Sequence, residues 1–586
     1  MVPHPQADRP ATQPPPAGSP ARLRRRLARP ALPHCVAPVL GLVILGLVAA
    51  CARPEPEPQT EAPAPPPEGT PRLVLLVTVD QFYGGYVERF RPLFRSGLSR
   101  LLDEGVWFAE AHHEHATTST APGHATLATG AHPGTHGVVG NSWYERSESA
   151  EVYCCDDSEF GRAPRRLLSP TLGDLLKERW PQAKVFAVAG KDRASILTAG
   201  HHADGAFWYD SNTGGFTTSD YYPAPGAKRP WLEEFHRRDL VGGLFGTAWT
   251  PSIPLEEMAA YGVEPLDFGL FPRQFPRAFG GLSMRPDRSF YASVYGTPMA
   301  DWAVVQMAKA MVAGEALGTD AYPDLLSVGL SALDAAGHGY GPDSPEMLDT
   351  LLRVDRVLGE LLDFLDQQVG REHVVVSLSS DHGVGTVPEL LLAAGEDAGR
   401  FGAEQVLCVQ QLGLELGRTF GIAEIDWMPE MGYLDREALE ARQVDYAGLR
   451  DAVAEGLTAC DRIDAVYTRE EIEAATTPRL RLYRNSFHPE RSPDLIVDLT
   501  PNTLTSSTVA SHGSPNRYDT WVPWLLAAPS LPAQRVDLPV ATVDVAPTLS
   551  GLLGLPMRAD GIDRGELLAS GAASSAPAAA SATPDP

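Results

Sequence analysis

Thr120 is the residue of this chain whose type and setting best suit a nucleophile. It lies in residues 117–126, where Ser, Thr and Pro residues precede an Ala-rich stretch. This pattern predicts the start of a helix, with Ser119 or Thr120 near the N-cap and Pro122 in the first turn. A hydroxyl there faces free backbone N–H groups and the positive end of the helix dipole, which suit an incoming phosphoryl or sulfuryl group. From this segment alone, a plain helix cap is the alternative.

Six further side chains are carboxylates or imidazoles, the ligand types that Zn²⁺ accepts together. Each of them taken singly could be a loop residue, a cap or a surface histidine, so the prediction rests on the whole set. Six such ligands and one hydroxyl are enough to hold two metal ions. The set is Asp80, Asp334, His338, Asp381, His382 and His512.

Apolar runs rich in β-branched residues lead to several of these polar groups. Buried parallel strands have this character, and α/β folds place functional groups at the carboxyl ends of such strands. The runs are residues 72–79, 185–188, 325–330 and 374–378, and they lead to Asp80, Lys191, Asp334 and Asp381. We therefore expect these side chains at the ends of buried strands.

Helical patterns separate the strands. They are residues 91–104, 301–317 and 345–369. The repeated order of strand, polar residue and helix predicts an α/β fold, a doubly wound α/β/α sandwich with a mostly parallel central sheet. From about residue 391 to 493 the pattern loosens, and we interpret this region as an inserted subdomain. The main sheet is expected to resume at residues 494–498 and 521–527, before a closing helix at residues 543–553.

Composition limits the classes of partner. The chain has 586 residues, 43% of them hydrophobic, which is enough for a large buried core. Its 48 Lys and Arg residues stand against 74 Asp and Glu residues, for a formal net charge of −26. This acidity argues against nucleic acid, whose binding proteins carry basic patches. It would also disfavour an anionic substrate unless bound cations reverse the field at the site.

The first 51 residues have the features of a targeting segment. A basic stretch at residues 22–29 precedes an apolar run at residues 39–50 that is short for a transmembrane span. Small residues directly before Cys51 resemble a bacterial lipobox, in which the cysteine is lipidated. We predict a signal peptide with lipobox at residues 1–51 and an exported periplasmic or cell-envelope lipoprotein, with the outer membrane favoured. An ordinary secreted protein or a single anchor helix is the alternative.

The rest of the chain divides by composition. Residues 52–70 form a Pro/Glu-rich linker, and residues 570–586 form an Ala/Ser/Pro-rich tail that we predict to be disordered. The folded domain is expected between them, at residues 71–569. In an oxidising compartment Cys408 with Cys460 is a plausible disulfide. Sequence leaves the pairing open among the four cysteines of this domain, which are Cys154, Cys155, Cys408 and Cys460.

The motifs resemble those of the alkaline phosphatase superfamily. Within it they are most similar to the PafA-type alkaline phosphatases with a threonine nucleophile, neighbours of the nucleotide pyrophosphatase/phosphodiesterases. The resemblance rests on Thr120 and on the segments around Asp80, Asp334, Asp381 and His512, whose order and spacing all fit. It extends from residue 71 to about residue 555, and it implies an alkaline phosphatase-like catalytic domain.

The resemblance also implies a cofactor and roles for the site residues. Two Zn²⁺ ions would be bound, one by Asp334, His338 and His512, and the other by Asp80, Asp381, His382 and the Thr120 oxygen. Asn141 would donate a hydrogen bond to a phosphoryl oxygen, and Lys191 and Arg193 would bind its remaining charge. Zinc would activate the Thr120 hydroxyl, a covalent phosphothreonine would form, and a zinc-bound hydroxide would hydrolyse it.

Lys191 and Arg193 bear on the substrate class. A phosphate monoester is a dianion whose oxygens need strong donors beyond the metals, and charge-assisted bonds from Lys and Arg meet that need. A diester needs an apolar slot instead. We therefore expect hydrolysis of small-molecule phosphate monoesters of broad range, with membrane contact only through the lipid anchor. The physiological substrate and the oligomeric state are left open by the sequence.

A phosphodiesterase or nucleotide pyrophosphatase with the same two metals is the main alternative function. A sulfatase is disfavoured because Thr120 stands where a Cys-x-Pro-x-Arg motif would be needed. A lipid-anchored protein that binds phosphate compounds without turnover would not need both a full ligand set and a nucleophile. The histidines of residues 112–115 are interpreted as loop and strand entry. The aromatic residues at 207–209 and 221–222 suit either a pocket wall or the core.

Overall fold

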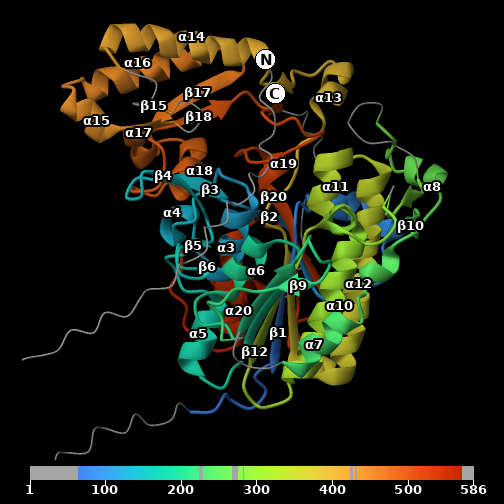
Figure 1. Ribbon diagram of the computed structural model, residues 1–586. Coiled ribbons are helices and arrows are strands. Elements are labelled where there is room, and N and C mark those ends of the chain that lie inside the picture. Colours follow the sequence, from blue (N-terminus) through green and yellow to red (C-terminus); the bar gives the residue numbers. More distant parts are fainter. Residues whose placement is uncertain are drawn as a thin grey trace, which may run out of the picture. The chain divides into compact units, whose positions relative to one another are not determined.

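Figure 1 shows the computed structural model, which describes residues 64–223, 229–266, 275–280, 283–422, 427–428 and 432–569. The predicted signal peptide and lipobox, Cys51 included, lie outside the described residues, as do most of the predicted linker and the tail at residues 570–586. Within the described part of the chain, no helix has the length and apolar character needed to cross a membrane.

A ten-stranded sheet forms the centre of the fold (Figure 1). Its strands lie in the order β21-β2-β20-β13-β1-β12-β7-β8-β9, and β22 pairs with β2. Their bounds are β1 Leu73–Val79, β2 Val106–His112, β7 Val185–Ala189, β8 Gly205–Tyr209, β9 Phe216–Thr217, β12 Asp324–Leu330, β13 Val374–Ser379, β20 Trp521–Ala527, β21 Gln534–Val536 and β22 Val540–Ala541. The run from β13 to β8 is parallel, whereas β20 and β9 are antiparallel to their neighbours. The predicted mostly parallel sheet is confirmed.

Strand β1 shows why both faces of the sheet are covered by helices. All seven of its residues are buried, and successive side chains of a strand point to opposite faces. Leu73, Leu75 and Val77 join one hydrophobic cluster, and Val74 and Leu76 join another. The first cluster includes helices α1 Gly85–Phe90, α2 Gly97–Glu104, α10 Pro298–Glu315 and α12 Pro345–Gln368, and the second includes α3 Thr120–Thr129, α5 Leu172–Arg179, α6 Asp192–Ala199 and α20 Val545–Leu552. The predicted α/β/α sandwich is confirmed.

Residues 91–104 do not form the single helix that their pattern predicts. A 3-10 turn at Arg91–Leu93 ends at Phe94, whose backbone is extended, and α2 begins only at Gly97. The cause is a tertiary contact, because the Asp355 carboxylate of α12 accepts backbone N–H groups at this break. Its donors are Arg95 at 2.7 Å, Ser96 at 3.0 Å, Leu98 at 2.7 Å and Ser99 at 3.3 Å.

A mainly helical region with its own hydrophobic core lies between β14 (Gly399–Arg400) and β19 (Thr503–Leu504), drawn in orange in Figure 1. Its elements include α14 Ala403–Phe420, α15 Arg436–Ala441, α16 Tyr446–Thr458, β17 Ile463–Thr468, α17 Arg469–Ala474, α18 Pro478–Ser486 and β18 Leu495–Leu499. A disulfide between Cys408 and Cys460 joins α14 to the loop that follows α16, so the plausible pair is the one formed among the pairings that the sequence left open. Cys154 and Cys155 are buried free thiols.

The prediction that the main sheet resumes at residues 494–498 is wrong. Those residues belong to β18, which pairs antiparallel with β17 in a separate two-stranded sheet. Leu495 packs in the same core as Leu449 of α16, so the strand completes the helical region. The chain returns to the central sheet only at β20, between β2 and β13.

Candidate metal centre and nucleophile

Neighbouring strands of the central sheet deliver the candidate site. Asp80 follows β1, Asp381 follows β13 and Lys191 follows β7, while Asp334 lies in α11 (Ala332–Tyr340), which follows β12. Because β13, β1, β12 and β7 are parallel neighbours in the sheet, their carboxyl ends meet at one edge. The start of α11 is held by Asp301 of α10, whose carboxylate accepts the Ala332 N–H at 3.1 Å.

Thr120 is the first residue of α3, as the pattern predicted. Ser119 has the extended backbone of an N-cap residue, and Pro122 lies in the first turn. The Thr120 side chain is 1% exposed, and its Oγ1 accepts hydrogen bonds from Lys191 Nζ at 3.2 Å and from Arg193 Nη2 at 3.5 Å. Two cations beside a hydroxyl favour its ionised form.

Gly123 allows α3 to approach the metal-ligand candidates. A Cβ atom at this position would lie 2.1 Å from the Asp381 backbone oxygen, so any other residue would force the helix away. One turn after Thr120, the ring Nδ1 of His124 donates to the Thr120 backbone oxygen at 2.9 Å and lies 3.3 Å from Asp381 Oδ2. Helix α3 and the Asp381 segment are therefore packed against each other.

Asp80, Asp381 and His382 form one group that could hold a metal ion. One ligand atom from each lies within 4.8 Å of the other two. All three residues are fully buried, and Asp80 Oδ1, Asp381 Oδ2 and His382 Nε2 have no hydrogen-bond partner among the described residues. Buried polar atoms are almost always paired, so unpaired atoms that face one another fit a bound cation.

A second group consists of Asp334, His382 and His512, again with ligand atoms within 4.8 Å of one another. His338, which the sequence placed here, has its Nε2 atom 3.1 Å from Asp334 Oδ1. His512 Nε2 lies 3.5 Å from the same oxygen. The structure thus brings all six predicted ligands together, and it places His382 between the two groups, with its ring stacked on that of His512 at 3.4 Å.

Backbone carbonyls fix the orientation of the three histidine rings. Nδ1 of His338 donates to the Ala510 oxygen at 2.8 Å, and Nδ1 of His512 donates to the Thr118 oxygen at 2.8 Å. Nδ1 of His382 faces the Gly383 oxygen at 3.0 Å. Since a carbonyl can only accept, each ring carries a proton on Nδ1, and in its neutral form it has the Nε2 lone pair for a metal ion. Metal-binding histidines show this arrangement.

The charges of the site are strongly coupled. Burial raises the pKa of Asp80 well above its ordinary value, and the neighbouring Asp334 and Asp381 raise it further. Burial would also raise the pKa of Asp334, but Lys191 and His338 outweigh it and hold that pKa well below its ordinary value. Burial lowers the pKa of His382, which keeps the ring neutral. A cation bound among these groups would stabilise the ionised carboxylates and the neutral imidazole alike.

Lys191 is the central cation of the site. Its Nζ lies 2.5 Å from Asp80 Oδ2 and 2.8 Å from Asp334 Oδ2, besides its bond to Thr120. Burial alone would lower its pKa, but Asp334 and Asp80 raise it above the ordinary value, so Lys191 is protonated. It connects the Thr120 hydroxyl with both groups of ligand candidates.

Asn141 contacts the residue that follows Thr120, and Arg193 contacts Thr120 itself. Asn141 Oδ1 accepts the Ala121 N–H at 2.8 Å, so its Nδ2 group remains the donor atom of the amide. Arg193 Nη1 donates to the Tyr153 hydroxyl at 3.3 Å, and this hydroxyl donates to Asp192 at 2.5 Å. Sequence reasoning missed Tyr153, and no pattern in the chain marks it, because its role depends on β4 (Ala150–Tyr153) folding beside α6.

The histidines of residues 112–115 and the aromatic residues at 207–209 and 221–222 were the segments whose role the sequence left least certain. His113 and His115 are buried, and His113 Nε2 contacts the Ser380 backbone oxygen at 3.0 Å. The residues of this stretch do not appear in either group of metal-ligand candidates found among the described residues. Phe207 and Tyr222 belong to the hydrophobic clusters of the sandwich.

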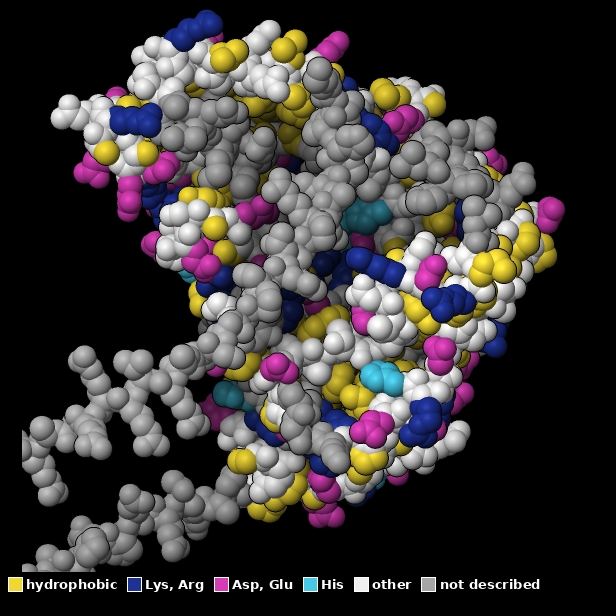
Figure 2. Space-filling model, in the orientation of Figure 1, with side chains coloured by type: hydrophobic (Ala, Val, Ile, Leu, Met, Phe, Trp, Pro, Cys, Tyr) yellow, Lys and Arg dark blue, Asp and Glu magenta, His cyan; other side chains and the backbone are white. Residues whose placement is uncertain are grey.

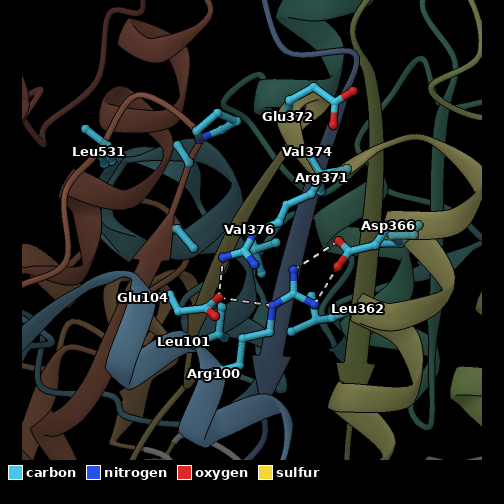
Figure 3. Close-up of a pocket in the computed structure, with 14 residues that line it drawn as sticks. Arg100, Leu101, Glu104, Leu362, Asp366, Arg371, Glu372, Val374, Val376 and Leu531 are labelled. Carbon is cyan, nitrogen blue, oxygen red and sulfur yellow. Dashed lines mark hydrogen bonds and ion pairs between the residues drawn. The ribbon is translucent and has the colours of Figure 1, made fainter.

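In the part of the chain that the structure describes, the charged cavity at the other end of the sheet lacks unpaired ligand atoms of this kind. On the face in Figure 2, Asp and Glu side chains are scattered among Lys and Arg side chains. A cavity of about 380 Å³ lies at the amino end of β13 (Figure 3). There Arg100 pairs with Glu104 at 3.3 Å and with Asp366 at 2.9 Å, and Arg371 also pairs with Glu104. These charges satisfy one another.

The chain is similar to known proteins over most of its length. The family described as type I phosphodiesterase / nucleotide pyrophosphatase matches residues 74–517. Alkaline phosphatase PafA of Elizabethkingia meningoseptica is 30% identical over 504 residues, which are 82% of this chain and 91% of that protein. Alkaline phosphatase PhoD of Zymomonas mobilis is 31% identical over 535 residues, 85% of this chain and 88% of that protein. The crystal structure of wild-type PafA superposes with a TM-score of 0.76 at 28% identity and covers 85% of this chain and 99% of its own.

Proposed function

From the premise that this chain belongs to the type I phosphodiesterase/nucleotide pyrophosphatase family of the alkaline phosphatase superfamily, and is a phosphatase, we propose that it hydrolyses phosphate monoesters through a covalent intermediate on Thr120. The observation that carries the proposal is the position of the Thr120 hydroxyl. It lies at the start of α3, in hydrogen-bond contact with Lys191 and beside buried Asp and His atoms that lack partners.

Two Zn²⁺ ions are proposed as the cofactor. The donor set fits zinc, because neutral imidazoles and carboxylates are mixed and several of their atoms are buried and unpaired. Asp80, Asp381, His382 and Thr120 would hold one ion, and Asp334, His338 and His512 would hold the other. Zinc, when bound, lowers the pKa of a coordinated hydroxyl and supplies positive charge for the phosphate oxygens.

The first step forms a bond between Thr120 Oγ1 and phosphorus. Thr120 gives up its proton, the bond from phosphorus to the ester oxygen breaks, and the ester oxygen takes up a proton and leaves as the alcohol. Lys191 and Arg193, which already donate to Thr120 Oγ1, favour its alkoxide form. In the second step a water oxygen bonds to phosphorus and the water gives up a proton, while the bond to Thr120 breaks and its oxygen regains a proton; inorganic phosphate is released.

Positioned donors carry most of the catalysis in this proposal. Phosphoryl transfer needs charge placed at the phosphate oxygens rather than covalent chemistry by the protein. Asn141 offers its Nδ2 group, and Arg193 offers a guanidinium that Tyr153 orients at 3.3 Å. These groups resolve the apparent conflict between an acidic protein and an anionic substrate.

The cations beside Thr120 support monoesters over diesters. A monoester presents one more charged oxygen than a diester, and Lys191 together with Arg193 can meet it with charge-assisted hydrogen bonds. The phosphatase names of the two relatives also support this choice. Hydrolysis of phosphodiesters is the second candidate, because the matching family is described by that activity.

We further propose that the protein is exported and held in the cell envelope by lipid on Cys51. Support comes from the apolar run and the small residues before that cysteine. The disulfide between Cys408 and Cys460 also suits an oxidising compartment. In cell fractionation Cys51→Ser should move the protein from the membrane to the soluble fraction; a variant that stays with the membrane contradicts the anchor.

The test of the function is kcat/KM of the zinc-loaded protein on para-nitrophenyl phosphate and on its bis-ester, each with and without a chelator. A large preference for the monoester that disappears with the chelator and returns with zinc is the expected result. A preference for the diester would move the enzyme to the second candidate. Hydrolysis of the monoester that survives complete removal of metal would contradict the metal site.

A further inference from the structure

Gln81 stands between the two groups of metal-ligand candidates. It follows Asp80 directly at the end of β1, and it is 1% exposed. In the sheet β1 lies between β13 and β12, the strands that lead to Asp381 and Asp334. A residue at the end of the middle strand can therefore reach the carboxylates on both sides.

The backbone nitrogen and the side-chain nitrogen of Gln81 each donate to one of these carboxylates. Its backbone N–H donates to Asp381 Oδ1 at 3.2 Å, and its side-chain Nε2 donates to Asp334 Oδ1 at 2.7 Å. One residue thus contacts an acidic ligand candidate from each group. In each case it occupies one carboxylate oxygen, which restricts the rotation of the carboxylate.

The backbone of Gln81 is held in an unfavourable conformation. Its φ is +66°, in the left-handed region that residues with a side chain rarely adopt. Such conformations persist where surrounding contacts require them, and they gather at functional sites. Glycine would adopt this φ without strain. The chain nevertheless has a residue here whose amide reaches Asp334.

Gly337 of α11 leaves the space that the Gln81 amide fills. A Cβ atom at position 337 would lie 1.7 Å from Gln81 Oε1 and 2.9 Å from Gln81 Cδ. Gly337 lies between Asp334 and His338, the two ligand candidates of this helix. The missing side chain at 337 thus permits the amide to pack against the helix turn that carries both of them.

We propose that Gln81 is a positioning residue that holds Asp334 and Asp381 in the orientation that binds metal, so that one side chain adjusts both halves of the site together. This inference rests on the proposed metal-dependent function. An amide donor is required, because glutamate has the same shape but its ionised carboxylate cannot donate a hydrogen bond. It would instead place a negatively charged oxygen against the Asp334 carboxylate. The residue acts through the ligands and does not touch the substrate.

Gln81→Gly is the decisive variant because it separates this role from a structural one. Glycine relieves the positive φ, so the metal-free variant should unfold at the same temperature as the original protein or higher. If Gln81 only shapes the turn, metal affinity should not change. If it positions the ligands, zinc affinity should fall about 10- to 100-fold, the usual effect of losing a partner of a metal ligand.

Gln443 provides a matched control. It is also a glutamine in the left-handed region, with φ +60°. It is exposed and follows α15, in the mainly helical region outside the central sheet. Gln443→Gly makes the same chemical change and relieves the same kind of strain. Its zinc affinity and kcat/KM should equal those of the original protein.

Gly337→Ala tests the same contact from the opposite side. The added methyl group should displace the Gln81 amide, while alanine suits a helix better than glycine, so the helix itself is not weakened. Alone, this variant should also lower zinc affinity about 10-fold. In the Gln81→Gly background it should have little further effect, because the displaced amide is already absent.

Zinc affinity is measured by competition with a chromophoric chelator on folded protein, with thermal unfolding of the metal-free forms and kcat and KM of the loaded forms beside it. The expected result is a loss for Gln81→Gly and Gly337→Ala that is not additive in the double variant. Equal affinity of Gln81→Gly and Gln443→Gly, in a protein that binds zinc and is active, would overturn the inference alone. A protein that binds no zinc would overturn the proposed function and the inference together.

Discussion

Charged and polar side chains lie at both ends of strand β13, but they are paired with one another at one end and partly unpaired at the other. At its amino end, Arg100, Glu104 and Asp366 pair with one another around the cavity of Figure 3. At its carboxyl end, Asp381 and His382 are fully buried, and each keeps a polar atom without a hydrogen-bond partner among the described residues. Only the second arrangement calls for a ligand, since unpaired buried polar atoms are costly.

A ligand site is therefore better distinguished from a structural network by buried polar atoms that lack hydrogen-bond partners than by the number of charged side chains. Both ends gather acids and bases beside the same strand. The amino end resembles an ordinary network of partly exposed ion pairs, which contributes modestly to stability. At the carboxyl end, burial and then the neighbouring carboxylates raise the pKa of Asp80, so the group of ionised carboxylates is unfavourable without a cation.

Of the substitutions considered, Thr120→Ala at the carboxyl end of the sheet should cause the largest loss of activity. With the hydroxyl gone, kcat/KM on a monoester should fall by about 10³-fold or more, because no covalent intermediate can form. Zinc content measured by elemental analysis should be nearly unchanged, and Thr120→Ser should restore part of the rate. A Thr120→Ala protein with undiminished turnover would show that the nucleophile lies elsewhere.

Arg193→Ala tests whether this arginine favours phosphate monoesters over diesters. Arg193 contacts Thr120 and Tyr153 but no metal-ligand carboxylate in the hydrogen bonds described above, so its loss should leave zinc in place. We expect kcat/KM to fall about 10²-fold for para-nitrophenyl phosphate, the effect of losing one charged donor in the transition state. The bis-ester should lose far less. Equal losses on both esters would contradict the role given to this arginine.

His136 is a buried histidine whose partners are complete, in contrast to His382. Its Nδ1 accepts the Val138 N–H at 3.1 Å, and burial lowers its pKa to about 3. The unfolded chain therefore takes up a proton below about pH 6.5 that the folded chain refuses, so this group's contribution is present above that pH and is lost as the pH falls toward 3. In metal-free protein, His136→Asn should make the fall in unfolding free energy shallower by up to about 1.4 kcal/mol per pH unit.

The measurement for His136 is urea unfolding of both metal-free proteins between pH 7 and pH 4.5. Metal-free protein is used so that zinc loss does not contribute to the slope. Parallel slopes of unfolding free energy against pH for the two proteins would show that His136 is not the group that titrates.

Arg100→Met should have the smallest effect. The substitution keeps an apolar chain over the cavity and removes the charge that pairs with Glu104 and Asp366. The free energy of unfolding should fall by about 1 kcal/mol or less, as for other exposed or half-exposed ion pairs. Monoester kcat/KM should stay within about twofold of the original value, because the charge pairs lie at the opposite strand end. A large loss of activity would mean that the two ends of the sheet are coupled.

Much of the fold followed from local patterns. The buried runs at residues 72–79 and 374–378 predicted β1 and β13, and the alternation of strands with helices predicted the sandwich. The pattern failed at residues 91–104, where the Asp355 carboxylate interrupts the helix, and at β18, where an apolar strand found its partner in β17. Both failures concern contacts between distant parts of the chain, which periodicity does not report.

The sequence by itself determined the residue types of the candidate site and the local frames that carry them. Thr120 at a helix start and Asp80 at a strand end depend on neighbours within a few residues. Their proposed chemical roles remain predictions that the experiments above test.

Only the tertiary structure decided how these pieces meet. The strand order β13-β1-β12 places Gln81 between two carboxylates that lie 253 and 300 positions away in the chain, and the shared position of His382 depends on the same convergence. Local propensity acts over a few residues, whereas the donors and acceptors of a buried site are paired, or left unpaired, by the packing of the whole sheet.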